Sequence, residues 1–159
     1  MEKLLIDRIP HPQIGDDSPL PEIPERTPAD LLVAEDNAIN QKVIRLILQR
    51  LGYRPDIVSN GEEALSMLRK RKYDIVLMDA QMPVMDGLEA MKKIHEMHPR
   101  VQDRPVIIVL TAHAKVGDKE AFLKSGMDFY LSKPVQINQL MKSLTKAIDL
   151  KKERAAQSS

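Results

Sequence analysis

The chain has 159 residues, of which 43% are hydrophobic and 30% are charged, and its formal net charge is +1. These values are typical of one globular domain with room for an extended tail, and they leave no overall field that would draw the chain to nucleic acid or to an anionic membrane. The absence of cysteine excludes disulfides, thiol catalysis and thiolate metal sites, and favours a reducing, cytoplasmic location. Residues 4–6 are too short an apolar run for a signal peptide or a membrane span.

The first 30 residues differ in composition from the rest of the chain. They contain six of the 11 prolines, several acids and little periodic hydrophobicity, which is typical of an extended linker or tail. From Leu31 onward, short β-branched runs alternate with helical patterns, as in repeated βαβ units. We therefore expect a linker or tail at residues 1–30, a folded domain at residues 31–150 and a polar C-terminal tail at residues 151–159.

The first expected strand, residues 31–34, is followed by Glu35 and Asp36. A helix should begin after Asn37 and stop at Gly52, because asparagine is a good N-cap and glycine ends helices readily. Five apolar residues at helical spacing predict the face that packs on the sheet: Ile39, Val43, Leu46, Ile47 and Leu51.

The second expected strand, residues 56–58, follows Pro55. Proline lacks the N–H that a strand donates to its neighbour, so this strand belongs at an edge of the sheet. Asn60 and Glu63 have the spacing of a capping box and predict the start of the second helix.

Two longer apolar strands follow, at residues 75–78 and 106–110, and each is directly followed by a polar residue, Asp79 and Thr111. A second capping-box spacing, Asp86 with Glu89, predicts the third helix between them. A fourth helix is expected at about residues 116–125.

The last expected strand, residues 130–131, is followed closely by Lys133, and a helix should then run over residues 137–148. Five strands that each precede a helix predict an α/β fold, a doubly wound five-stranded parallel sheet of flavodoxin-like (βα)5 topology in the order 2-1-3-4-5.

That strand order brings the polar residues after four of the strands to one edge of the sheet. The carboxyl ends of parallel strands meet there, so Glu35, Asp36, Asp79, Thr111 and Lys133 should share one pocket. Three clustered carboxylates repel one another unless a cation lies among them, and oxygen ligands suit Mg²⁺, with Mn²⁺ as an alternative. An ionised aspartate at this position could attack phosphorus and form an acyl phosphate without a separate base.

The same residues belong to a set of sequence blocks that resembles a known family. The blocks are VAEDN at 33–37, VLMDAQMP at 76–83, DG at 86–87, LTA at 110–112 and LSKP at 131–134. Together they are similar to the receiver domain of two-component response regulators over roughly residues 31–150. The segments at 35–40 and 117–128 look most like receivers of hybrid histidine kinases.

The resemblance implies a role for each acid in the pocket. Asp79 would be the phosphoacceptor, and Asp36, Asp79 and the backbone carbonyl of Gln81 would bind Mg²⁺. Glu35 would act on the metal largely through a bound water molecule.

The resemblance also implies roles for residues on the other side of the pocket. Thr111 and Lys133 would contact the phosphoryl group, with a cis peptide bond at Lys133–Pro134. Tyr130 would be a switch aromatic that moves with Thr111. Gln81 and His113 would tune the lifetime of the acyl phosphate.

These features predict that the chain functions as a phosphorelay receiver, in preference to two alternative functions. Its donor would be a phosphohistidine on the dimerisation helices of a histidine kinase or on a histidine phosphotransfer protein, without nucleic acid or direct membrane contact. The chain would dephosphorylate itself, while any kinase activity would belong to a longer, cytoplasmic or membrane-tethered parent protein.

A haloacid dehalogenase-type phosphohydrolase is the first alternative, but that family has a second aspartate where this chain has Gln81. A degenerate receiver that only binds partners is the second, and the complete pocket argues against it.

Overall fold

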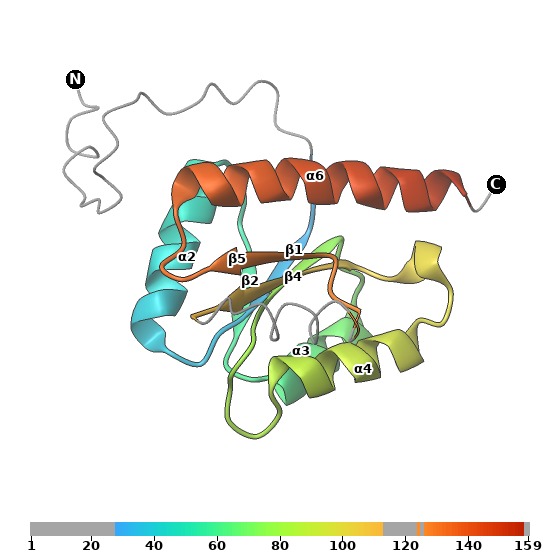
Figure 1. Ribbon diagram of the computed structural model, residues 1–159, viewed down its shortest axis with the longest axis horizontal. Helices are drawn as coiled ribbons and strands as arrows, with labels where there is room; N and C mark the ends of the chain where they lie inside the picture. The colour runs from blue at the N-terminus through green and yellow to red at the C-terminus, as the bar shows by residue number, and fades with distance from the viewer. Residues whose placement is uncertain (1–27, 113–123, 125, 158–159) are drawn as a thin grey trace.

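The computed structural model describes residues 28–112, 124 and 126–157, which contain one five-stranded sheet (Figure 1). Its strand order is β2-β1-β3-β4-β5, and every neighbouring pair is parallel. The predicted sheet and its order are therefore confirmed. The strands are β1 (Leu31–Ala34), β2 (Asp56–Val58), β3 (Ile75–Asp79), β4 (Val106–Thr111) and β5 (Phe129–Ser132).

Helices cover both faces of this sheet. Figure 1 shows α2 and α6 on one face and α3 and α4 on the other. The helices are α2 (Ala38–Arg50), α3 (Gly61–Lys70), α4 (Gly87–Met97), the short 3-10 helix η2 (Val101–Asp103) and α6 (Ile137–Ala156). The helix expected at residues 116–125 lies, apart from Lys124, outside the described residues.

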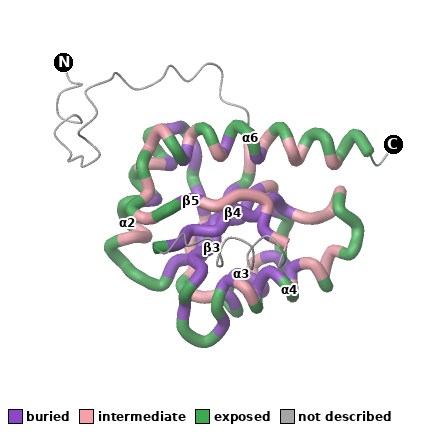
Figure 2. Tube along the Cα trace, viewed as in Figure 1, coloured by how far each residue is buried: buried purple, intermediate pink, exposed green. Residues whose placement is uncertain are grey.

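The central strands are buried on both faces, as Figure 2 shows. Successive side chains of a strand point to opposite faces, so one run of apolar residues supplies two cores. In β3, Val76 and Met78 join the core under α3 and α4, whereas Ile75 and Leu77 join the core under α2 and α6.

The predicted helix caps are present in the structure. The side chain of Asn37 accepts hydrogen bonds from the backbone N–H groups of Ile39 and Asn40, and Asp86 caps α4 in the same way. Asn60 caps α3, while Glu63 reaches back to the N–H of Ser59 at 2.7 Å. These caps fix where each helix leaves the carboxyl edge of the sheet.

The predicted buried face of α2 was wrong in part. The residues that this helix buries are Ile44 and Leu48, with Leu51 just beyond its end and Ile47 partly buried. Ile39, Val43 and Leu46 are instead 73%, 42% and 46% exposed. The helix carries apolar residues on two faces, and only one face can pack on the sheet.

The last helix is longer than its apolar pattern predicted. A helix of 20 residues spans about 30 Å, whereas a strand of five residues spans only about 17 Å. The carboxyl end of α6 therefore passes beyond the sheet, through Ala156 and into the segment expected to be a tail. There Lys151 Nζ donates a hydrogen bond to the carbonyl of Arg104 at 2.9 Å, and Arg154 forms an ion pair with Asp128.

The described chain begins slightly before the predicted domain boundary. Ala29 packs against the core under α2 and α6, and Asp30 accepts backbone hydrogen bonds from Asp74 and Ile75 at 2.9 and 3.2 Å. Residues 1–27, which make up nearly all of the expected linker, lie outside the described residues. Within the described part of the chain, no helix combines the length and the hydropathy needed to cross a bilayer.

Candidate functional site

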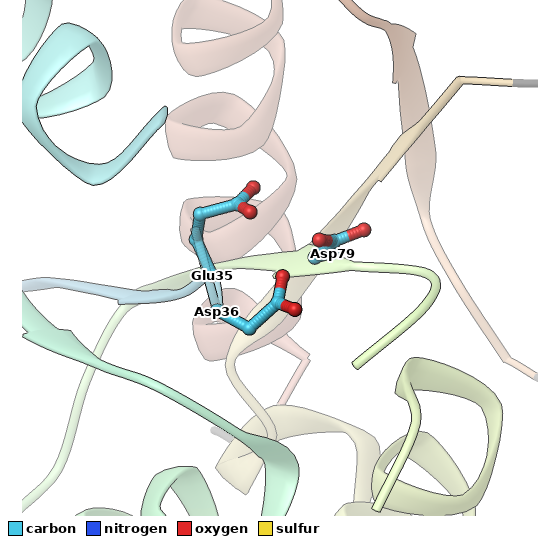
Figure 3. A group of neighbouring side chains, drawn as sticks. All are labelled: Glu35, Asp36 and Asp79. Carbon is cyan, nitrogen blue, oxygen red and sulfur yellow. The ribbon is translucent and has the colours of Figure 1, made fainter. Parts of the chain in front are cut away.

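Three carboxylates meet at the carboxyl edge of the sheet. Glu35 and Asp36 follow β1, and Asp79 is the last residue of β3, the strand beside it (Figure 3). One oxygen from each of the three carboxylates lies within 4.8 Å of the others. Glu35 is 0% exposed and Asp79 is 4% exposed, whereas Asp36 faces solvent. The structure thus brings together the three acids that the sequence predicted would converge.

Asp79 is held by a contact to each of its carboxylate oxygens. Its Oδ1 accepts a hydrogen bond from the backbone N–H of Gln81 at 3.1 Å. Its Oδ2 lies 2.9 Å from Nζ of Lys133. These two contacts fix the orientation of the Asp79 carboxylate, and a carboxylate held in this way can act as a nucleophile.

Lys133 lies between two buried carboxylates. Its Nζ is 2.9 Å from Asp79 and 3.0 Å from Oε1 of Glu35. Burial on its own would lower the pKa of Lys133, but the charges and hydrogen bonding of Asp79 and Glu35 outweigh burial and raise that pKa above its ordinary value. The ammonium group is therefore charged at every pH at which a protein normally works.

A backbone hydrogen bond places Lys133 in the pocket. Its N–H donates a hydrogen bond to the carbonyl of Thr111 at 2.9 Å, so the segment after β5 remains attached to the end of β4. The peptide bond between Lys133 and Pro134 is cis, as the resemblance implied. Thr111 itself is the last residue of β4 and is buried.

The loop after β3 is fixed close to Asp79. A Cβ atom on Gly87 would lie 2.6 Å from the backbone oxygen of Asp79, so only glycine fits there without a shift in the backbone. The loop also contains a tight turn in which the N–H of Met85 bonds to the carbonyl of Pro83 at 2.7 Å. Val84, at the centre of that turn, has a φ of 69°, which is a strained conformation for a β-branched residue.

The remaining predicted residues lie at different distances from the pocket edge. Gln81 is exposed and adjoins Asp79 through its N–H. Tyr130 pairs with Val109 in the sheet, two positions before Thr111 and Ser132 reach the edge, and its side chain packs against the core under α3 and α4. His113 lies outside the described residues.

Sequence reasoning did not single out two residues of the first turn of α2 that contact this site. The carboxylate Oε2 of Glu35 lies 3.4 Å from Nδ2 of Asn40, and the carbonyl of Glu35 accepts a hydrogen bond from Nε2 of Gln41 at 2.6 Å. Both residues stand close behind the acid pair in the sequence, and this proximity was the available signal. Polar residues near a helix start are common, so the signal is weak.

The donor set of the pocket fits a hard divalent cation. Carboxylate oxygens are the ligands that Mg²⁺ and Mn²⁺ prefer, and the exposed side of Asp36 leaves room for water ligands. The described residues of the site provide no thiolate, and the pocket acids are Glu35, Asp36 and Asp79. A cation in this site would place positive charge beside the carboxylate of Asp79.

Comparison with known families agrees with this geometry. The response regulator receiver domain family matches residues 31–145, which is most of the chain. The chain belongs to this family. The receiver fold and the family membership of the chain do not favour a haloacid dehalogenase-type phosphohydrolase.

The receiver domain is similar to segments of much longer kinases. It is 44% identical over 113 residues to hybrid signal transduction histidine kinase I of Dictyostelium discoideum, an alignment that covers 68% of this chain and 6% of that protein. It is 37% identical over 134 residues to the aerobic respiration control sensor protein ArcB of Escherichia coli K12, covering 84% of this chain and 16% of that protein. The chain therefore spans only a small part of the length of these relatives.

Two solved receiver structures are also similar. One is the receiver domain of the sensor histidine kinase PA1611 from Pseudomonas aeruginosa, crystallised with a magnesium ion in its active site cleft; identity is 38%, the TM-score is 0.69, and the match covers 77% of this chain and 99% of that one. The other is the receiver domain of Ssk1 from Saccharomyces cerevisiae, in complex with the histidine phosphotransfer protein Ypd1; identity is 32%, the TM-score is 0.69, and the match covers 73% of this chain and 86% of that one.

Proposed function

We propose that this receiver domain accepts a phosphoryl group from a phosphohistidine onto Asp79. The observation that carries the proposal is the buried Asp79 carboxylate at the end of β3, with Lys133 at 2.9 Å and two further acids beside it. An oxygen of Asp79 forms a bond to phosphorus, the bond from phosphorus to the donor imidazole breaks, and the bonding pair stays on the imidazole nitrogen. Hydrolysis then releases inorganic phosphate and regenerates the carboxylate.

The surrounding residues neutralise and orient charge in this transfer. The ammonium group of Lys133 pairs with the phosphoryl oxygens, and the hydroxyl of Thr111 donates a hydrogen bond to them, because the transfer depends mostly on positioning and charge stabilisation. Mg²⁺, or Mn²⁺ in its place, supplies positive charge to the phosphoryl oxygens when it is bound. Asp36, Asp79 and the carbonyl of Gln81 would hold the ion, and Glu35 would reach it through water.

The exposed apolar side of α2 supports docking of a helical partner beside the pocket. Ile39, Val43 and Leu46 are separated by four and three residues, so they form one stripe along the helix. The charged residues of α2 are all basic: Lys42, Arg45 and Arg50. A partner helix with apolar residues flanked by acids would complement this surface, which we call the α2 stripe. The Ssk1 receiver, solved with a phosphotransfer protein, supports a partner of that class.

The wider biological context of the chain is part of the same proposal. Similarity to segments of hybrid kinases supports an origin as the receiver of such a kinase, with a linker before Pro28 and a receiver that continues to the end of α6 at Ala156. The phosphorylated state would be read out through Thr111 and Tyr130. Gln81 and His113 would set the rate of hydrolysis, and the parent kinase could be cytoplasmic or membrane-tethered.

Mass spectrometry after incubation with Mg²⁺ and acetyl phosphate tests the proposal directly. The wild-type chain should gain one hydroxylamine-labile phosphoryl group, because hydroxylamine cleaves acyl phosphates. Asp79→Asn keeps the shape of the side chain but removes the nucleophile, so it should gain none. Asp103→Asn, which changes a partly exposed acid on η2, is the matched control and should be labelled normally. A wild-type chain that is never labelled would favour a receiver that only binds partners.

A further inference from the structure

Glu35 is the most completely enclosed acid of the site, and two adjacent side chains of α2 help to hold it. Its backbone N–H donates to the carbonyl of Val58 at 3.1 Å. Its own carbonyl accepts from Gln41, whose Nε2 also lies 3.4 Å from Oγ of Ser59. Gln41 therefore ties the end of β1 to the segment after β2 and fixes the backbone of Glu35.

Asn40 holds the other end of the same residue. The Oε2 atom of Glu35 faces two donors, the N–H of Asn37 at 3.2 Å and Nδ2 of Asn40 at 3.4 Å. The Oε1 atom lies 3.0 Å from Nζ of Lys133. With Oε2 directed toward α2, Oε1 is directed toward Lys133, so the orientation of this carboxylate decides where the ammonium group is anchored.

Lys133 needs an anchor that does not change during the reaction. Its ammonium group is shared between Glu35 and Asp79 at nearly equal distances. When Asp79 becomes an acyl phosphate, the oxygen that forms the new bond no longer offers its charge to Lys133. Glu35 keeps its full charge, so Glu35 would hold the ammonium group at the phosphoryl oxygens.

We propose that Asn40 is a positioning residue for phosphoryl transfer, acting through Glu35 on Lys133. The inference rests on the proposed function, because it assigns a part in the reaction at Asp79. An amide suits this task, since it donates a hydrogen bond to Glu35 without carrying charge. A cation at position 40 would compete with Lys133 for Glu35, and an anion would repel Glu35.

The test compares rates of labelling by acetyl phosphate at saturating Mg²⁺ for the wild type, Asn40→Ala and a control. Asn40→Ala should react about five- to tenfold more slowly, which corresponds to the loss of one hydrogen bond to a charged group that is somewhat long. Gln49→Ala is the matched control, because it removes an exposed amide from the same helix, and it should react at the wild-type rate. Thermal unfolding of each variant checks that the helix remains folded.

A double-mutant cycle distinguishes action through Glu35 from any general effect on α2. In a Glu35→Gln background, Asn40→Ala should slow the reaction less than twofold, because the carboxylate that it orients is gone. A second measurement requires neither phosphorylation of the chain nor a folded Glu35→Gln variant. The ¹³Cε and ¹⁵Nζ NMR signals of Lys133, recorded without metal or phosphodonor, should shift in Asn40→Ala and stay in place in Gln49→Ala.

The outcomes separate this inference from the function on which it rests. If wild type is never labelled at Asp79, both fall. If wild type is labelled and Asn40→Ala reacts at the same rate, or is slowed equally in both backgrounds, the function stands and the positioning role is overturned. Unchanged Lys133 signals in Asn40→Ala would overturn it as well. A slower reaction that disappears in the Glu35→Gln background, together with shifted Lys133 signals, supports it.

Discussion

Removing the α2 stripe should slow phosphoryl transfer from a protein donor while leaving the reaction with a small donor unchanged. The perturbation is the triple substitution of Ile39, Val43 and Leu46 by alanine. Because these side chains are 73%, 42% and 46% exposed, a partner can still cover roughly half of each. Full burial of such a side chain contributes about 1.5–3 kcal/mol, so the three together offer about 2–3 kcal/mol beyond what alanine retains. That corresponds to a loss of about 30- to 150-fold in affinity.

The assay measures initial rates of transfer from a phosphorylated histidine phosphotransfer protein at concentrations below saturation. Acetyl phosphate provides the parallel reaction, because a small donor does not need to dock on α2. The receiver itself should remain stable, since alanine is a good helix former and the three side chains contribute little to the core. Val101→Ala, at another exposed apolar residue, is the control. Equal losses with both donors, or no loss with the protein donor, would refute the reasoning.

Three further predictions concern stability and titration. Arg154→Met should lower the stability by about 1–2 kcal/mol in chemical unfolding, because it leaves the partly buried carboxylate of Asp128 without its cation, and Asp128→Asn in the same chain should recover part of that loss. Tyr73 should titrate with a pKa of about 12 instead of 10.0, because its phenol is desolvated and donates a hydrogen bond to Asp56. The contribution of this group to stability is therefore complete below pH 10.0 and is lost as the pH rises toward 12. Phenolate absorbance and the free energy of unfolding, each measured as a function of pH, check this prediction. Val84→Gly should leave the free energy of unfolding unchanged or raise it by up to about 1 kcal/mol. The strain energy relieved at a φ of 69° exceeds the entropic gain that glycine gives to the unfolded chain. A loss of more than about 1 kcal/mol in chemical unfolding would contradict this.

The sheet and the converging acids were predictable because their signals are local. A short apolar run followed by an acid, as in β3 and Asp79, records both a buried strand and its polar end. Pro55 marked the edge strand because proline cannot complete a ladder. Strand order then followed from topology, and with it the meeting of Glu35, Asp36 and Asp79.

The buried face of α2 could not be predicted with the same certainty. Ile39, Val43 and Leu46 have the same helical spacing as the residues that are buried, Ile44 and Leu48. Periodicity shows that a helix has apolar faces, but it does not show which face meets the sheet. That choice depends on the direction in which the helix leaves β1, which is a property of the tertiary structure.

The extent of α6 was missed for a related reason. Its apolar pattern ends near Ile148, so the sequence offered no core residues beyond that point. The last turns are held by polar contacts instead, from Lys151 to Arg104 and from Arg154 to Asp128. Contacts between residues this far apart in the sequence leave no periodic trace.

The course of α6 also determines where a label or a tether can be attached to the receiver. The helix returns from the carboxyl edge to the amino edge of the sheet, and the chain enters β1 from that same amino edge at Asp30. Attachments before Pro28 or after Ala156 would therefore leave from the side opposite Asp79. A fluorophore, an affinity tag or a surface tether at either position would leave the pocket that contains Asp79 accessible. Partner binding and phosphoryl transfer can therefore be followed on an immobilised receiver.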